Sequence, residues 1–206
     1  ASLVALIFGS IAAGATYVFR SSAIRLIAVV LAVSMFTLPW ILIYPPLQKV
    51  IVEHRAGLAG NRQERLIIWE FVSKKAMEAP FIGHGFRASR KISEKAGTAN
   101  IVEPRYHDVA RVRKLPLHPH NWVLQIWLEL GWIGVGLAAL LLSGLIGIIG
   151  KHRGNPLFMA AAMGSLVTFF CIASLSFGFW QKWWLATGWL ALGTFMLVAP
   201  QSDESD

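Results

Sequence analysis

The sequence has a single cysteine, Cys171, so no disulfide bond can form within these 206 residues. Acidic residues are also few, with eleven Asp and Glu against nineteen Lys and Arg. Outside the apolar segments there is no Asp-x-Asp pair of the kind that holds Mg²⁺ on a pyrophosphate. No charged segment precedes the first apolar run, which argues against a signal peptide followed by a mature domain. We expect the chain to be the C-terminal part of a longer polytopic protein.

Apolar residues dominate what is present. They make up 55% of the sequence, which also has nine Trp and eighteen Gly, and the mean hydropathy is +0.56. A run of about 20 apolar residues is long enough to cross the hydrocarbon core of a bilayer. Five such runs cover Ala1 to Val18, Leu26 to Tyr44, Trp122 to Ile149, Pro156 to Phe177 and Trp183 to Ala199. The sequence therefore predicts an all-α polytopic membrane protein.

Basic residues in the short loops predict the orientation of these spans. Arg20 and Arg25 lie between the first two spans, and Lys151 and Arg153 lie between the third and fourth. Short cytoplasmic loops carry an excess of Lys and Arg, so both loops and the acidic tail QSDESD are expected in the cytoplasm. The expected organisation is two spans over 1–44, an external loop over 45–119, three spans over 120–199 and a cytoplasmic tail over 200–206.

The external loop is basic, with fourteen Lys or Arg against seven Asp or Glu. Loops longer than about 60 residues cross membranes largely regardless of charge, so this composition does not conflict with the orientation. A basic surface above a membrane attracts anions such as phosphates, pyrophosphates and acidic sugars. For any single Lys in the loop, a solvated surface position is the simpler interpretation.

One helix is predicted within the loop. Asn61 followed by Glu64 resembles an N-terminal capping pair, and RLIIWEFVSKKAMEA continues as a helix that ends before the next proline. Arg62, Arg65 and Trp69 fall at three- and four-residue spacing, so they share one face of this helix.

A glycine-rich turn, PFIGHGF, follows the helix. Gly83 and Gly85 permit a tight backbone whose amides are expected to approach an anion. The next segment, RASRKISEKAGTANIVEPRYHDVARVRKLP, is polar and basic with little periodicity. It predicts irregular structure with a short helix, part of which orders when substrate binds.

A third span begins at HPHNWVLQIWLELGWIG. His120 is expected to begin the helix, and Asn121, Gln125 and Glu129 follow at four-residue intervals along one face. An ionisable residue inside a span marks a functional site or a buried polar contact. For Gln125 and Glu129 a helix-to-helix hydrogen bond that fixes packing is an equal alternative. For His120 the balance favours chemistry, because histidine exchanges protons near neutral pH and its ring can take a proton from a hydroxyl.

A zinc site is the alternative use of the histidines. His118 and His120, with His107 and Asp108 upstream, offer imidazole and carboxylate ligands. The His-Pro-His spacing is not a recognised ligand spacing, and no cysteine or third strong ligand is near. We therefore expect no metal and no other cofactor.

These motifs resemble the signature of the bacterial O-antigen ligases. His120 and Asn121, nine residues, Gly131, two residues and Gly134 match one part of it, and RLIIW with APFIGHGF is similar to the Arg-to-Trp and Pro-Phe-x-Gly-x-Gly pattern at the start of that superfamily's large periplasmic loop. The resemblance implies the C-terminal part of a GT-C-type multi-span glycosyltransferase of the bacterial inner membrane, with further spans upstream and a mostly helical periplasmic loop.

The same resemblance implies a reaction and its residues. Such an enzyme moves a glycan from undecaprenyl pyrophosphate to lipid A-core, and the lack of metal-ligand patterns in the sequence predicts that this transfer needs no metal. Arg65 matches the family's loop arginine, which holds the pyrophosphate, and His120 matches its histidine, which activates the acceptor hydroxyl. Arginine suits this role because its planar, permanently charged fork grips phosphate oxygens. The other substrate-binding candidates are Arg62, Arg87, Arg111, Arg113, His118, Asn121 and Gln125.

Three functions compete at this point. The ligase is the first, and an O-antigen polymerase or protein O-oligosaccharyltransferase of the same superfamily is the second. The third is a polysaccharide transporter, but transporters usually show repeats or broken helices near the midplane, and neither is evident. Gly131, Gly134 and Gly136 instead predict close helix packing. Membrane lipids are expected partners, and nucleic acid is not.

Overall fold

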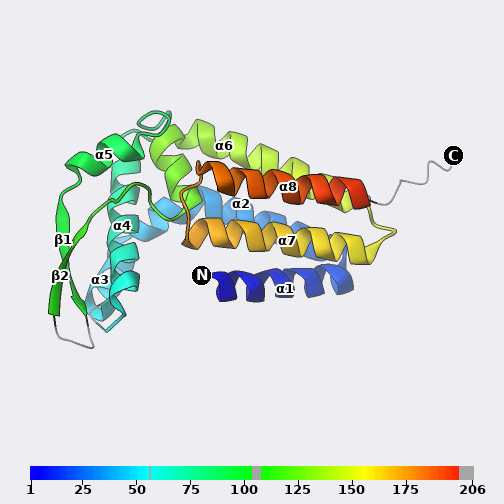
Figure 1. Ribbon diagram of the computed structural model, residues 1–206, viewed down its shortest axis with the longest axis horizontal. Coiled ribbons are helices and arrows are strands. Elements are labelled where there is room, and N and C mark those ends of the chain that lie inside the picture. Colours follow the sequence, from blue (N-terminus) through cyan, green and yellow to red (C-terminus); the bar gives the residue numbers. More distant parts are fainter. Residues whose placement is uncertain (56, 104–107, 200–206) are drawn as a thin grey trace. The chain divides into compact units, whose positions relative to one another are not determined.

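The computed structural model describes residues 1–55, 57–103 and 108–199 (Figure 1). Its elements follow the chain as α1 (Ser2–Phe19), α2 (Ser21–Ile43), α3 (Pro45–Arg55), α4 (Gly60–Ala76), α5 (Ser89–Lys95), β1 (Thr98–Glu103), β2 (Asp108–Arg113), α6 (Trp122–Lys151), α7 (Pro156–Leu175) and α8 (Lys182–Val198). They form two compact units whose boundaries fall inside α2 and α6. We call residues 1–34 with 138–206 the helical unit and residues 35–137 the mixed unit.

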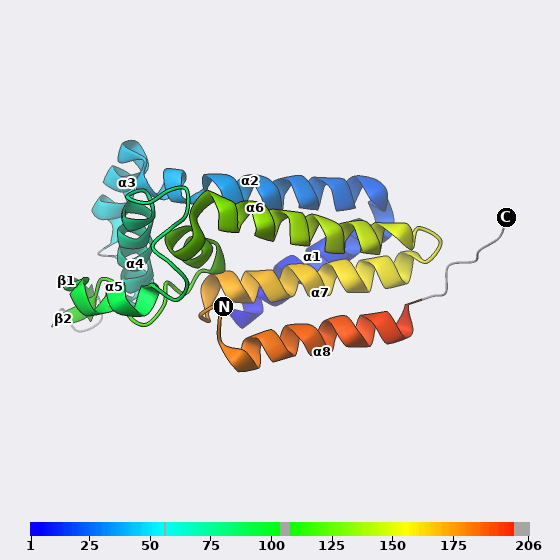
Figure 2. The same ribbon diagram turned by 90° about the horizontal axis from the view of Figure 1, so that it is seen from above.

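Within the helical unit, α1 packs closely along α7 (Figure 2). The buried face of α1 consists of the small residues Ala5, Gly9, Ala12 and Thr16. A Cβ atom added to Gly9 would lie 2.9 Å from the backbone oxygen of Gly164 on α7. Small residues at helix interfaces let two backbones approach closely, which is the packing that stabilises helix pairs in lipid.

Four helices of the described chain are long and apolar enough to cross a membrane, namely α1, α2, α6 and α7. They coincide with four of the five predicted spans. The fifth, predicted over residues 183–199, forms α8, which has 17 residues and is one residue shorter than α1. Large apolar side chains point outward from the helical unit, among them Leu3, Leu140 and Leu190 at about 70% exposure. Such a surface suits contact with lipid.

The mixed unit has a hydrophobic core of its own. Its buried members come from the end of α2, from α4, from the end of α5, from the segment after β2 and from the start of α6. They are Leu42, Ile68, Val72, Ala96, Leu115, Leu124 and Leu128. This core holds the start of α6 against α4, and so it positions the segment between β2 and α6 that contains the histidines.

A hydrogen bond from α6 replaces a backbone hydrogen bond that α2 lacks. Pro39 lies inside this helix and has no N–H to donate to the carbonyl of Met35, four residues earlier. The indole N–H of the fully buried Trp127 on α6 donates to that carbonyl at 2.8 Å. A buried carbonyl without a partner costs about 1–3 kcal/mol, so this bond stabilises both helices in this register.

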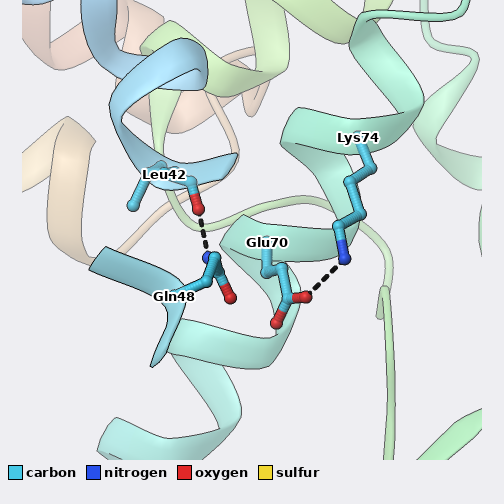
Figure 3. A network of polar contacts seen from close by, with 4 residues as sticks. All are labelled: Leu42, Gln48, Glu70 and Lys74. Atoms are coloured by element: carbon cyan, nitrogen blue, oxygen red, sulfur yellow. Dashed lines mark hydrogen bonds and ion pairs between the residues drawn. The ribbon is translucent and has the colours of Figure 1, made fainter. Parts of the chain in front are cut away.

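The corner between α2 and α3 is closed by a side chain. The amide of Gln48 on α3 donates to the carbonyl of Leu42, near the last turn of α2 (Figure 3). On the neighbouring α4, Lys74 and Glu70 form an ion pair of 2.6 Å. The lysine of that pair is largely exposed, so the pair contributes little stability.

The loop region departs from expectation in two places. The helix predicted from Asn61 begins at Gly60 with Ala59 as its N-cap and no side-chain capping bond, so the capping prediction was wrong. The short helix expected after the glycine-rich turn is α5, but residues 98–103 and 108–113 form an antiparallel hairpin. The prediction of irregular structure there was wrong. Helices of 11, 17 and 7 residues make the region only partly helical.

Candidate functional site

The histidine pair lies immediately before α6. The helix begins at Trp122, two residues later than predicted, and Asn121 caps it: its side-chain oxygen accepts from the backbone N–H of Leu124 at 3.1 Å. His120 precedes the cap with a φ of 55°, in the left-handed region. Residues other than glycine seldom adopt this conformation, and Asn, Asp and His are the most frequent exceptions. The cap and this turn together fix the direction in which the His120 side chain leaves the backbone.

One hydrogen bond from α4 and one ring contact within the segment hold the His-Pro-His residues. The indole N–H of Trp69 on α4 donates to the carbonyl of Pro119 at 3.1 Å. The rings of His118 and His120 lie edge to face with centroids 4.3 Å apart, and both residues are half-buried. Burial, with a smaller contribution from the charge of His120, lowers the pKa of His118 to about 4. His118 is therefore neutral at physiological pH.

A sharp kink divides α6 at Gly131, whose φ is 58° and ψ is −152°. The kink breaks two helical hydrogen bonds, from the N–H groups of Trp132 and Ile133 to the carbonyls of Leu128 and Glu129. The backbone of residues 80–85 satisfies all four groups. Trp132 and Ile133 donate to the carbonyls of residues 80 and 81 at 2.8 and 3.2 Å, and the carbonyls of residues 128 and 129 accept from the N–H groups of residues 84 and 85 at 2.9 and 3.0 Å.

Glycine is required on both sides of this contact. A Cβ atom on Gly131 would lie 2.4 Å from the carbonyl oxygen of Pro80, and one on Gly83 would lie 2.4 Å from the backbone of Glu129. The prediction that the glycine-rich turn offers its amides to an anion was wrong for both glycines. The N–H of Gly83 donates to Ala79 and that of Gly85 donates to Glu129.

The structure also differs from the prediction that the α6 glycines pack against another helix. Gly131 packs against the backbone of the 80–83 turn rather than against a helix. A Cβ atom on Gly134 would meet Leu130 of its own helix, across the kink, and one on Gly136 would meet nothing within 4 Å. Of the three glycines, only Gly131 makes a close backbone contact with another segment, and that segment is a loop.

Glu129 anchors the start of α5. Its side chain is fully buried and accepts from the backbone N–H of Arg87 at 2.8 Å and from the hydroxyl of Ser89 at 2.5 Å. The amide of Gln125 donates to the same carboxylate at 3.3 Å. The polar stripe predicted along α6 exists, and in Gln125 and Glu129 it forms the packing hydrogen bonds that were one of the two alternatives. Sequence analysis missed Ser89 as the partner, because their positions are 40 apart.

The five candidate arginines lie on α4, before α5 and on β2. Arg62 and Arg65 lie on α4, where Arg65 is half-buried one turn before Trp69. Arg87 is exposed with a φ of 59° and lies between the glycine-rich turn and α5. Arg111 and Arg113 are exposed on β2, opposite Asn100 and Thr98 of β1. Within the described part of the chain, none of the five forms an ion pair, so their charge is available to an anion.

The described part of the chain has no group of three His, Cys, Asp or Glu side chains placed to hold a metal ion. His107 and the side chain of Asp108, which the zinc alternative needs, lie outside the described residues. Of the predicted site residues, the structure brings together His118, which is neutral, and His120, which has a left-handed backbone conformation.

Comparison with known proteins identifies the family. Residues 1–139 match the protein family described as O-antigen ligase. The chain belongs to the O-antigen ligase family. The matched segment contains every candidate site residue, from Arg62 to Gln125, and it ends within α6. Together with its four apolar helices, this membership makes the chain part of a multi-pass membrane protein.

Relatives of this O-antigen ligase family member carry the provisional name polysaccharide ligase. One from Rickettsia conorii is 36% identical over 137 residues, which are 66% of this chain and 32% of the relative. One from Rickettsia typhi is 32% identical over 165 residues, 77% of this chain and 39% of the relative. The chain thus spans about a third of the length of these relatives. No solved structure matches it.

Proposed function

We propose that this chain is the C-terminal part of a ligase-type glycosyltransferase. The enzyme moves a glycan from undecaprenyl pyrophosphate to a hydroxyl of lipid A-core at the periplasmic face of the inner membrane. Membership of the O-antigen ligase family supports the ligase class. The observation that carries the assignment to this site is His120, held in a left-handed conformation between the Trp69–Pro119 bond and the Asn121 cap.

His120 acts as the general base in this proposal. Its ring takes the proton of the acceptor hydroxyl while the acceptor oxygen forms a bond to the anomeric carbon of the glycan. The bond from that carbon to the pyrophosphate oxygen breaks, and undecaprenyl pyrophosphate leaves with the bonding electrons. General-base catalysis of this kind contributes a factor of about 10² to 10⁴. The pKa of about 4 leaves His118 neutral, so it does not repel the proton that His120 receives.

The arginines stabilise the leaving group. Pyrophosphate is a good leaving group once its charge is neutralised, so the reaction needs cations more than a strong acid. Arg65 is placed first, because it is half-buried and lies about 6 Å along α4 from the Trp69 that contacts the histidine segment. Arg62, Arg87, Arg111 and Arg113 supply further positive charge for the donor or a phosphorylated acceptor.

Asn121 and Gln125 have a supporting role in the proposed substrate site. Both are buried and carry structural hydrogen bonds to Leu124 and Glu129. We assign them to the floor of the substrate site, below the histidines, where they hold α6 in place.

The proposed topology places the loop of residues 45–119 in the periplasm and both basic turns in the cytoplasm, within a GT-C-type fold. Transfer is proposed to be independent of metal and cofactor. Loss of activity in EDTA with recovery on adding Mg²⁺ would contradict that independence.

The test compares wild type with His120→Ala in the full-length protein, expressed at matched membrane levels in a host that lacks it. Lipopolysaccharide is resolved on a gel, and carrier-linked glycans are analysed alongside. For a ligase, the variant loses core-attached glycan while long polymers accumulate on the carrier.

Other outcomes identify the alternatives within the superfamily. Accumulation of single repeat units on the carrier would make the enzyme an O-antigen polymerase, and loss of glycan from proteins alone would make it a protein O-oligosaccharyltransferase. Unchanged glycan pools would refute the role of His120 and favour the transporter.

A further inference from the structure

A cavity of about 620 Å³ lies in the helical unit, between the first turns of α2 and the last turns of α6. Its apolar lining includes Ile24 and Ala28 of α2 and Ile146 of α6. The cavity lies at the end of the unit that carries the α1–α2 and α6–α7 connections, which both views show together (Figures 1 and 2). All of its lining residues belong to the helical unit, and none belongs to the candidate site of the mixed unit.

Three cations line the cavity. Arg25 comes from α2, Lys151 ends α6, and Arg153 lies in the turn that follows; all three are exposed. The Nε–H of Arg25 donates to the carbonyl of Ser21 at 3.3 Å, which ties the guanidinium to the first turn of α2. Residues 1–34 and 138–199 contain no Asp or Glu at all. The described part of the helical unit therefore offers these cations no carboxylate, and the cavity is suited to an anion.

The α6 wall of the cavity leaves room for an acyl chain. Gly147 and Gly150 both line it, and a Cβ atom added to either would meet nothing within 4 Å. Gly144, one turn earlier, has the same open surroundings. Gly150, Gly147 and Gly144 therefore leave a strip of the α6 surface without side chains, which we call the glycine groove, and it runs from Lys151 toward the apolar middle of the helix.

We propose that this cavity binds an anionic phospholipid, with the headgroup phosphate at Arg25, Lys151 and Arg153 and an acyl chain along the glycine groove of α6. Basic pockets between membrane helices bind anionic headgroups. A phospholipid fits both the cations and the apolar wall of the cavity, because it joins a phosphate to a hydrocarbon chain. A soluble anion would leave the apolar wall and the groove empty. The inference depends on the helices spanning a membrane and is independent of the glycan transfer proposed above.

The experiment uses the full-length protein in detergent and native mass spectrometry with added phosphatidylglycerol or phosphatidylethanolamine of the same acyl chains. Each basic side chain near an anionic lipid surface contributes about a fivefold change in affinity. Lys151→Gln with Arg153→Gln should therefore weaken phosphatidylglycerol binding about 25-fold. The matched control, Lys49→Gln with Lys182→Gln, removes two exposed cations outside the cavity and should change binding less than twofold.

A second variant tests the groove without changing charge. Gly147→Leu fills open space and should weaken phosphatidylglycerol binding while the thermal stability of the protein stays within a degree or two of wild type. Equal binding of the two lipids by wild type, or binding unchanged in both cavity variants, would overturn the proposal. Displacement of the lipid by glycerol phosphate alone would assign the cavity to a soluble anion instead.

The acidic tail is the remaining competitor for the cavity. Its three acidic residues are Asp203, Glu204 and Asp206, which lie outside the described residues. If the wild-type protein binds no phosphatidylglycerol but a variant with Asn, Gln and Asn at these positions does, the tail is the occupant and the proposal fails.

Discussion

The first part of α6 is buried all round, at residues 122–129, whereas helix α1 buries one face, and different interactions hold the two. In α6 the buried residues include Gln125 and Glu129, which hydrogen-bond to each other and, through Glu129, to the start of α5. In α1 the buried face is Ala5, Gly9, Ala12 and Thr16, which pack against α7. Hydrogen bonds fix atoms in direction as well as distance, whereas small-residue packing mainly fixes how near two helices lie.

This difference matches the work each unit is proposed to do. The mixed unit holds the histidine segment through single bonds with defined donors, such as the indole of Trp69 on Pro119. The helical unit offers an apolar frame and contains no acidic residue among its described positions. Variants of the mixed unit should therefore change the geometry of the site, whereas variants of the α1–α7 interface should change stability and leave the site unchanged.

The largest stability effect is expected from Glu129→Ala. The change leaves the buried donors of Ser89, Gln125 and the Arg87 backbone without their acceptor, which should cost about 3–5 kcal/mol. Glu129→Gln keeps the shape and one acceptor oxygen and should cost about half as much. Chemical unfolding of the full-length protein in detergent measures both. A loss below 1 kcal/mol for Glu129→Ala would mean that this network is not what holds α5.

The second largest loss of stability is expected from a substitution at the kink in α6. Gly131→Ala places a Cβ atom 2.4 Å from the carbonyl of Pro80 at a positive φ, and should destabilise the protein by about 3 kcal/mol. Gly136→Ala, in the same helix with open space around it, should be neutral or stabilise by about 0.5–1 kcal/mol. The same unfolding measurement compares the two, and equal effects would contradict the docking of the 80–85 turn.

A pH dependence of stability is expected from His118. Its pKa is about 4 in the folded protein and about 6.5 in an unfolded chain, so between these values the unfolded state binds more protons. Stability should fall as the pH drops from about 6.5 to 4 and then level off, by at most about 3 kcal/mol. His118→Gln should remove this part of the pH profile. A profile that is identical in the variant would show that His118 is not buried as described.

The smallest effect is expected in the helical unit. Gly9→Ala brings a Cβ atom to 1.8 Å from the hydroxyl oxygen of Thr168 and to 2.9 Å from the backbone oxygen of Gly164. The Thr168 side chain must rotate and α1 and α7 must separate slightly, at a cost of about 1–2 kcal/mol. Gly14→Ala on the same helix meets nothing within 4 Å and serves as the control. In thermal unfolding, Gly9→Ala should have a lower Tm than wild type and Gly14→Ala should not. Transfer activity per folded molecule should stay unchanged in both variants. Reduced activity per folded molecule would break the distinction between the two units.

Much of the fold follows from local patterns in the sequence. Apolar runs predicted the four long helices, and the four-residue spacing of Asn121, Gln125 and Glu129 predicted their shared face. The pairing of residues 98–103 with residues 108–113 was missed because these strands alternate weakly between apolar and polar residues. Local charge and glycine content could not show that the 80–85 turn docks into a kink, since that contact joins segments about 45 positions apart in the sequence.

For the candidate site, too, some features were predicted from the sequence and others needed the structure. His120 and Arg65 are predicted as site residues from their motifs, and the structure adds the left-handed backbone at His120 and the Trp69–Pro119 bond, which no spacing predicts. The role of Glu129 was open between function and packing. It needed a three-dimensional partner, Ser89, to be assigned to packing.

The most direct test of the central claim is the in vitro transfer rate of purified full-length His120→Asn. Asparagine tolerates the left-handed backbone but cannot take up the acceptor's proton, so the variant should fold like wild type, bind the carrier-linked donor and lose transfer by a factor on the order of 10² to 10⁴. A variant that transfers glycan at the wild-type rate would contradict the account, because His120 would then be part of the turn and not the base.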